Sequence, residues 1–326
     1  MDMRKCTAVL GTIVMLALAS TAAAQTKKQI VIGATSSSSS VFVYFVSLAK
    51  AINQYAPNLN ATVVETGATI DNLRRMDRGQ IDMGLATQET TAAKFAGAEP
   101  FNGAANDKLR TLVVFDDLPN MWVVRADADV STLADLKGKA FNSGINGSAT
   151  ELGVNIALAT LGIKTDPFKG ATKDAVDAIK DRRIAGFVKA GWHDASILDV
   201  MATTNVTFLS FTPQEEQTVA PKLPAGTIWF TVPAGTYEGQ PAVRAFGFAL
   251  GVVTTTALSP EDGYAILKAH DQGLKDMTSA YADIAGKDLW VKTCEESGIY
   301  LHAGAVKFLR EKGIAIPAKL IPPEAK

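Results

Sequence analysis

The stretch Gln29-Ile-Val-Ile-Gly-Ala-Thr-Ser-Ser-Ser-Ser-Ser-Val-Phe-Val-Tyr44 predicts a strand, a polar turn and a helix in direct succession. The apolar run from Ile30 to Ile32 ends at Gly33, which is typical of a short buried strand. After the hydroxyl-rich run 35–40, apolar residues recur at spacings of four, three and four, which indicates an amphipathic helix: Val41, Phe45, Leu48 and Ile52. Free backbone amides at a helix start favour an anion. This turn therefore predicts capture of a small anion.

Two further polar turns have the same character. Thr66-Gly67-Ala68-Thr69 and Asn146-Gly147-Ser148-Ala149-Thr150 each join a predicted strand to a predicted helix. Ser148-x-x-Glu151 is also a capping-box pattern, which marks the helix start. If the three turns meet in one cleft, they can bind an oxyanion through neutral hydrogen bonds. Two alternatives stay open: serine and threonine are common helix caps, and the run 36–40 could be a flexible linker.

Composition narrows the class of protein. The chain has 326 residues, of which 47% are hydrophobic and 20% charged, as expected of one large or two smaller globular domains. Its net charge of −1, without a cluster of lysines and arginines, argues against a nucleic-acid partner.

The N-terminus has the pattern of a secretion signal. Arg4 and Lys5 precede an apolar run 6–19 and the cleavage pattern Ala22-Ala23-Ala24, so residues 1–24 are predicted to be a signal peptide. Its removal leaves Cys294 as the only cysteine, which excludes an intrachain disulfide. The mature protein is therefore expected in the periplasm, as a monomer.

Strand and helix patterns alternate along the chain, which predicts α/β layers with a largely parallel sheet. Residues 112–115 and 121–124 are expected to be separate strands, with the adjacent Asp116 and Asp117 exposed between them. No linker rich in proline or glycine divides the chain, so a division into domains is expected to be discontinuous.

Signals of catalysis are few. His193, His270 and His302 lack the spacing of metal ligands, and nucleophile-elbow, phosphate-loop and dinucleotide motifs are missing from the sequence. We therefore expect no enzyme activity, no metal and no cofactor. Lys189, at a predicted strand end, could supply a counter-charge to an anion, although a solvated lysine is the favoured interpretation.

Several phrases of the sequence resemble the TAXI family, the solute-binding subunits of one class of tripartite ATP-independent periplasmic (TRAP) transporters. Ile32-Gly33 and Leu48-Ala49-Lys50 fall in register with the family's first strand and helix. The segment 65–73 resembles its second turn and Gln88 the glutamine after its next strand. Residues 144–151 resemble its Gly-Pro-Pro-Gly-Ser-Gly-Thr-Glu, and 302–305 its His-Pro-Gly-Ala.

The resemblance implies a two-lobed type II periplasmic binding protein fold, with a ligand cleft between the lobes. Lobe one would comprise residues 26–120 plus 235–326, and lobe two residues 121–234. The implied partners are a small organic anion (a carboxylate, dicarboxylate or acidic amino acid) and the membrane permease subunits of a TRAP transporter. The candidate ligand-binding residues are Thr35, Ser36, Ser37, Ser38, Ser39, Ser40, Tyr44, Thr66, Gly67, Ala68, Thr69, Gln88, Asn120, Gly147, Ser148, Ala149, Thr150, Gly191, Trp192 and Trp229.

The sequence departs from the family pattern at each turn. Ser38 and Ser39 stand where the family has paired glycines, and Ala68 and Ala149 each replace a glycine. Side chains at these positions predict a smaller or differently polar pocket. Two other functions stay open: a binding protein of an ATP-driven (ABC) importer for an oxyanion or sulfonate, and a periplasmic enzyme on the same fold.

Overall fold

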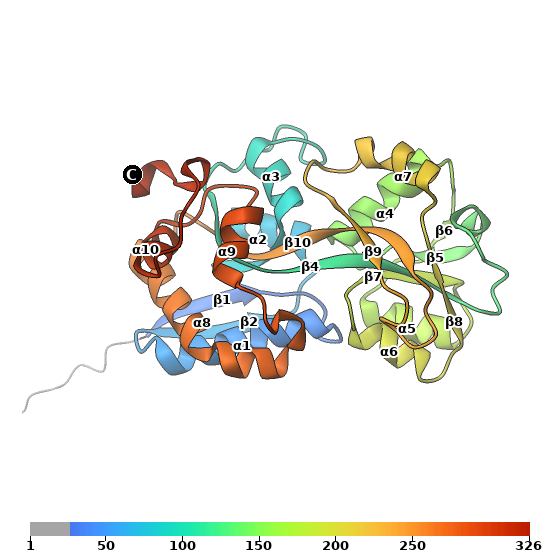
Figure 1. Ribbon diagram of the computed structural model, residues 1–326, viewed down its shortest axis with the longest axis horizontal. Coiled ribbons are helices and arrows are strands. Elements are labelled where there is room, and N and C mark those ends of the chain that lie inside the picture. The colour runs from blue at the N-terminus through green and yellow to red at the C-terminus, as the bar shows by residue number, and fades with distance from the viewer. Residues whose placement is uncertain (1–26) are drawn as a thin grey trace, which may run out of the picture.

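The computed structural model describes residues 27–326, so the predicted signal peptide lies outside the described residues. The chain forms two lobes side by side, and its C-terminus lies in the lobe that also contains β1 (Figure 1). The first lobe contains β1 (Lys28–Gly33), β2 (Leu59–Val64) and β3 (Met83–Thr87), with α1 (Ser40–Tyr55), α2 (Thr69–Asp77), α3 (Gln88–Ala96), α8 (Pro260–Ala280), α9 (Leu289–Glu296) and α10 (Ala303–Glu311).

The second lobe is formed by the middle of the chain. It contains β5 (Ala140–Asn142), β6 (Asp166–Pro167), β7 (Gly186–Ala190), β8 (Val206–Leu209) and β9 (Ile228–Val232), with α4 (Ala149–Thr160), α5 (Thr172–Lys180), α6 (Ala195–Met201) and α7 (Pro213–Val219). A short 3₁₀ helix, Leu133–Leu136, precedes β5. None of the helices between residues 27 and 326 is both long and apolar enough to span a bilayer.

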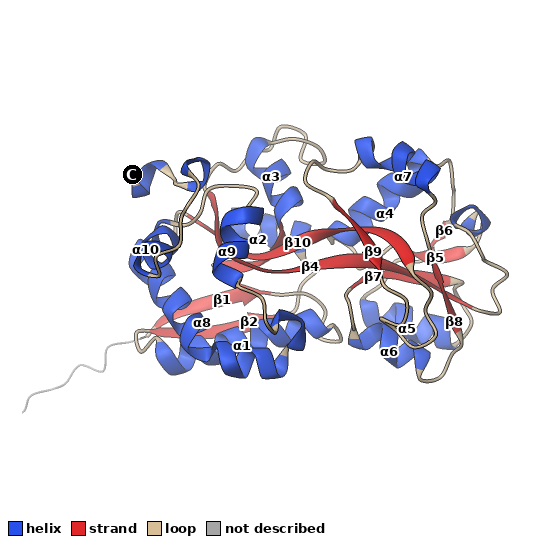
Figure 2. Ribbon diagram, viewed as in Figure 1, coloured by secondary structure: helices blue, strands red, loops and turns tan. Residues whose placement is uncertain are grey.

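Two long strands, β4 (Leu109–Arg125) and β10 (Val243–Thr255), pass through both lobes (Figure 2). They pair antiparallel from Leu109 to Pro119 and from Gly247 to Thr255. In the first lobe they extend the order β2-β1-β3-β10-β4, in which β1 is parallel to both β2 and β3. In the second lobe β4 pairs with β7 and β8, and β10 with β9. The lobes are therefore joined by a two-stranded ribbon.

The expectation of two short strands around residues 116–120 was wrong, because β4 is continuous there. Asp116 is fully buried rather than exposed, and its carboxylate pairs with Lys287 and accepts a hydrogen bond from the Tyr281 hydroxyl at 2.6 Å. Burial raises the pKa of Asp116 to about 6 even beside that lysine. Acidic residues that look like a turn thus lie inside a strand, because charged partners from the C-terminal part of the chain cover them.

Alternating side chains of the sheet make a separate core on each of its faces. In the first lobe Ile30 and Ile32 face α1, α8 and α10, while Val31 faces the side covered by α2 and α3. In the second lobe Trp122 and Val124 face the α4 side, and the neighbouring positions of β4 face α5 and α6. This is the period-two pattern of a sheet buried on both faces.

The segment 235–247 packs with the second lobe. Tyr237 and Val243 belong to the core that also contains Phe187 and Ile197, and Phe246 packs on Trp122 and Trp229. The return into lobe one, expected at residue 235, therefore occurs later in the chain, within β10 near Gly247.

Candidate functional site

A cavity lies where the two lobes face each other. Its volume is about 50 Å³, which is room for a molecule of a few heavy atoms. Both lobes contribute to the lining, which comprises Thr35, Ser39, Val41, Ala68, Thr69, Leu85, Thr87, Leu118, Gly144, Ile145, Ser148, Ala149, Thr150, Val188, Lys189, Ala190, Phe248 and Leu250. The N-terminal ends of α1, α2 and α4 all reach it.

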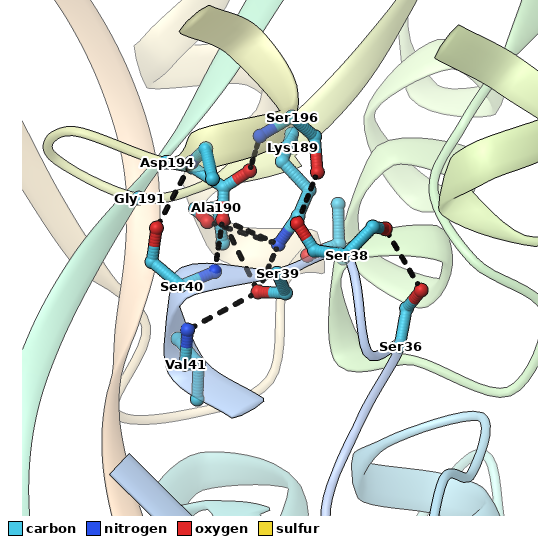
Figure 3. A network of polar contacts seen from close by, with 12 residues as sticks. Ser36, Ser38, Ser39, Ser40, Val41, Lys189, Ala190, Gly191, Asp194 and Ser196 are labelled. Atoms are coloured by element: carbon cyan, nitrogen blue, oxygen red, sulfur yellow. Dashed lines mark hydrogen bonds and ion pairs between the residues drawn. The ribbon is translucent and has the colours of Figure 1, made fainter. Parts of the chain in front are cut away.

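The N-terminus of α1 is already occupied by an acceptor from the second lobe. Ser39 is the N-cap, and its Oγ accepts from the Val41 amide at 3.3 Å. The Ser40 amide and the Ser39 hydroxyl both donate to Asp194 Oδ2, at 3.3 and 3.1 Å (Figure 3). A carboxylate of the protein therefore occupies the anion position that the serine run predicted.

The N-terminus of α2 is occupied in a similar way. The Ile70 and Asp71 amides donate to the carbonyl oxygen of Gly147, at 2.9 and 3.2 Å. Ala68, the residue before α2, has a φ of +68°, a left-handed conformation that favours glycine. The loop 146–147 of the second lobe thus closes directly onto this helix.

The N-terminus of α4 has two adjacent amides open to the cavity. Ser148 Oγ accepts from the Glu151 amide at 3.0 Å, as the capping-box pattern predicts, but the Glu151 carboxylate accepts from the Gly147 amide at 2.8 Å. The Ala149 and Thr150 amides donate to no acceptor within residues 27–326. Both residues line the cavity, so they can donate to a bound anion.

Lys189 is the charged side chain in the cavity lining. It lies at the end of β7 and its side chain is only 14% exposed, so it is not the solvated lysine favoured from the sequence. Its ammonium donates to Ser39 Oγ at 3.1 Å and to the Ala190 carbonyl at 3.3 Å, and it lies 3.3 Å from Asp194 Oδ2. A lysine has three protons to donate, and these three acceptors match them.

The rest of the lining is apolar or carries a neutral hydroxyl. Leu85, Leu118, Phe248 and Leu250 come from the strands of the first lobe and the ribbon, and Val188 comes from β7. Hydroxyls are contributed by Thr35, Thr69 and Thr87. Such a cavity suits a small solute that has one polar end and an apolar body.

Part of the serine run makes contacts between the lobes rather than lining the cavity. Ser38 contributes its carbonyl to the Ser196 hydroxyl at 3.1 Å, and its own hydroxyl lies 3.0 Å from that of Ser36. Ser40 Oγ accepts from the Ala195 amide at 2.9 Å, while Ser37 is exposed. The run therefore docks on the N-terminus of α6 (Figure 3).

The predicted residues are divided between the cavity and its surroundings. The lining includes Thr35, Ser39, Ala68, Thr69, Ser148, Ala149 and Thr150. The predicted residues that lie outside the lining are Ser36, Ser37, Ser38, Ser40, Tyr44, Thr66, Gly67, Gln88, Asn120, Gly147, Gly191, Trp192 and Trp229.

Several of these outer residues have clear structural partners. Tyr44 lies in the first-lobe core, where it stacks on Phe115 and its hydroxyl lies 2.8 Å from His270 Nε2. Gln88 accepts from Thr111 at 3.1 Å. Trp192 donates to the Asp117 carbonyl at 2.8 Å.

The other outer residues lie at turns or near the cavity. Thr66 donates to the Ala34 carbonyl at 2.9 Å, and Asn120 Oδ1 accepts from the Thr150 hydroxyl at 2.9 Å. Gly191 accepts from the Tyr237 hydroxyl at 3.1 Å. Trp229 packs edge-on against Phe211, with the ring centroids 5.2 Å apart.

The apolar lining and Thr87 were missed from the sequence. Leu85 and Thr87 end a buried strand beside the predicted Gln88, and Leu118, Phe248 and Leu250 lie in the ribbon. A period-two pattern cannot tell a core residue from a cleft residue on a strand that passes through both lobes. The one available signal was the position of Thr87 and Lys189 at strand ends, where ligands bind in α/β sheets.

Groups with strongly shifted pKa values lie outside the cavity. Burial raises the pKa of Glu89 to about 7 and lowers that of His270 to about 4, but neither residue lines it. Between residues 27 and 326, no three histidine, cysteine or acidic side chains gather as metal ligands would.

The chain matches a protein-family model over residues 32–313, and that model describes the NMT1-like family. The chain belongs to the NMT1-like family. Because the match spans nearly all the described residues, family membership applies to both lobes and the cavity between them.

Solved structures similar to this NMT1-like protein show its fold. The ligand-binding component of an ABC-type import system from Staphylococcus aureus is 13% identical, covers 92% of this chain and 98% of its own, and has a TM-score of 0.50. An ancestral arginine-binding protein bound to arginine is 17% identical, covers 80% of this chain and 99% of its own, and has a TM-score of 0.52. The predicted two-lobed periplasmic binding protein fold is thereby confirmed.

Proposed function

We propose that this protein is an extracytoplasmic solute-binding protein that captures a small organic anion in the cavity between its lobes and delivers it to a membrane permease. The observation that supports this most directly is the open N-terminus of α4. Its Ala149 and Thr150 amides lack acceptors within residues 27–326, and the Ser148 and Thr150 side chains also line the cavity. Amides at a helix start are donors for a carboxylate or another oxyanion.

The contacts between the lobes support capture by closure. Lobe one meets lobe two through the Ser39–Asp194 and Ile70–Gly147 contacts, both at the rim of the cavity. A solute enclosed there would touch both lobes at once and so stabilise the arrangement in which they meet. The signal peptide pattern and the fold both support a location in the periplasm for this solute capture.

Calorimetry and thermal-shift measurements with the mature protein test this proposal. The solutes are monocarboxylates, dicarboxylates, amino acids and alkanesulfonates, because a solute that binds the folded state raises the melting temperature by mass action. Stoichiometric binding of an organic anion would support the proposal. Tight binding of a neutral or cationic solute, with no organic anion bound, would overturn it.

A pair of capping serines gives a matched control. Ser148→Ala removes a helix cap that lines the cavity. Ser259→Ala removes the cap of α8, which lies outside the cavity lining; the Oγ of Ser259 accepts from the Asp262 amide at 3.1 Å. Each change should cost about 1 kcal/mol of stability. Only Ser148→Ala should also weaken anion binding, by roughly fivefold for one lost hydrogen bond.

The transporter class is proposed from the sequence resemblance to TAXI proteins, which implies an ion-gradient-driven TRAP permease. The ABC-type similarity of fold makes an ATP-driven importer the alternative. The neighbouring genes discriminate between them, because a TRAP system has a large membrane permease and no ATPase. An adjacent ATPase gene would overturn the TRAP assignment while leaving the capture of an anion intact.

A further inference from the structure

We infer that Asp194 determines the charge of the solute, so that the cavity accepts an anion with a single negative charge and rejects a dianion. This inference rests on the proposed function and narrows the class of anion. Its starting point is a carboxylate of the second lobe that reaches across the cleft to the first predicted anion position, at the start of α1 (Figure 3).

Asp194 is held firmly in this position. Its side chain is 1% exposed, and Oδ1 caps its own helix α6 by accepting from the Ser196 amide at 2.9 Å. Its amide donates to the Tyr237 hydroxyl at 2.9 Å, and that hydroxyl also donates to the Gly191 carbonyl at 3.1 Å. Tyr237 therefore acts as a positioning residue for the loop that carries Asp194. This leaves Oδ2 directed at α1.

Oδ2 satisfies the positive groups that would otherwise attract a second solute charge. It accepts from the Ser39 hydroxyl and the Ser40 amide at 3.1 and 3.3 Å, and it lies 3.3 Å from the Lys189 ammonium. Since Lys189 is the charged residue in the lining, the pair Lys189–Asp194 makes this wall of the cavity electrically neutral. A second carboxylate placed there would face Asp194 with no uncompensated cation.

The position of the open donors completes the argument. The Ile70 and Asp71 amides of α2 are taken by Gly147, and the start of α1 is taken by Asp194. The start of α4 offers two adjacent amides without an acceptor in residues 27–326, Ala149 and Thr150, whereas the start of α2 offers one, Thr69; the pair at α4 is therefore the position for one acidic group. The remaining wall is apolar, with Leu118, Phe248 and Leu250. One anionic end at α4 and an uncharged body against these side chains describe a short monocarboxylate or a similar monoanion.

The test compares the dissociation constants of monocarboxylates (propionate and pyruvate) and dicarboxylates (malonate and succinate) by calorimetry. The quantity of interest is the ratio of the dicarboxylate constant to the monocarboxylate constant. Wild-type protein should bind the monocarboxylates and disfavour the dicarboxylates at least tenfold, because juxtaposed like charges are costly at a buried site. Asp194→Asn should lower this ratio about tenfold, because Lys189 then lacks its counter-ion.

Two further variants separate charge selection from a structural effect. Lys189→Gln leaves Asp194 uncompensated and should raise the same ratio, so the two substitutions must move it in opposite directions. Asp199→Asn, on the same helix, removes an exposed carboxylate paired with Lys180 and should leave the ratio unchanged. If Asp194→Asn fails to fold, as judged by circular dichroism, Lys189→Gln still gives the test.

The outcomes distinguish this inference from the proposed function. Opposite shifts of the ratio in the two variants support the charge-selecting role of Asp194. Equal binding of both acid classes by wild-type protein, or an unchanged ratio in Asp194→Asn, overturns it while anion capture stands. Failure of every organic anion to bind wild-type protein overturns the proposed function itself.

Discussion

Replacing Gly67 by alanine is expected to hold the two lobes apart without unfolding either of them. Gly67 lies in the turn between β2 and α2, and a Cβ atom there would lie 2.4 Å from the Asn146 carbonyl oxygen of the other lobe. Carbon–oxygen contacts normally begin near about 3.3 Å, so the facing segments must separate by roughly 1 Å. The backbone of Gly67 has no left-handed φ, and alanine therefore fits its own turn.

The cost falls on the contacts across the cleft. A separation of this size breaks the hydrogen bonds from the Ile70 and Asp71 amides to the Gly147 carbonyl, which measure 2.9 and 3.2 Å. At about 0.5–1.5 kcal/mol for each bond, the closed arrangement loses roughly 1–3 kcal/mol. A solute that binds only when the lobes meet would then bind about 5–150-fold more weakly.

Small-angle scattering and calorimetry give the assay, and Gly138→Ala gives the control. Gly67→Ala should increase the radius of gyration and weaken binding, with little change in the free energy of unfolding. Gly138 has a φ of +73° and no heavy atom within 4 Å of an added Cβ, so its replacement should lower stability by about 1 kcal/mol and leave binding unchanged. Wild-type dimensions and affinity in Gly67→Ala would refute the reasoning.

Three further changes separate stability from binding. Burial raises the pKa of Glu89 from 4.5 to about 7. Its contribution to stability, on the order of 3 kcal/mol, is therefore full below pH 4.5 and is lost as the pH rises through 7. Glu89→Gln should remove this pH dependence of the unfolding free energy in urea, and an unchanged pH dependence would contradict the reasoning. Ala68→Gly should relieve the left-handed φ of +68° and raise the unfolding free energy by up to about 1 kcal/mol, whereas a lower value would argue against strain. Tyr44→Phe leaves His270 Nε2 without its partner at 2.8 Å and should cost about 1–2 kcal/mol in thermal unfolding; an equal loss of solute affinity with no loss of stability would instead place Tyr44 in the binding site.

Local patterns predicted most of the elements because each begins with its own signal. Ser148 and Ser259 cap α4 and α8 through bonds to amides three positions onward, and the apolar spacing after Ser40 gives α1 its buried face. The helices α7 and α9 were not predicted from the sequence. Strand β4 was divided wrongly because the partners of the Asp116 carboxylate come from the far end of the chain. These partners are the Tyr281 hydroxyl and the Lys287 ammonium.

The site was predictable only in part for the same reason. The three turns stand out in the sequence, yet which of their amides are already paired depends on how the lobes meet. Asp194 is 155 positions from Ser39 and looks like an ordinary cap of its own helix, a role that it also has. Its second role, at the start of α1, arises only when two distant segments are brought together by the fold.

The pairing of β4 with β10 also bears on how such a protein could have been assembled. Pro119 and Gly247 are direct partners at the point where the strands leave the first lobe, so the residues between them form one continuous excursion from a hairpin. Topologically the second lobe is an insertion into that hairpin, and its two ends lie side by side. A tight turn joining residues 119 and 247 would give a first domain made of one continuous chain. The excised segment would begin and end on neighbouring strands. A single insertion event would then supply the whole second lobe, and the cleft lies between the inserted lobe and the original domain.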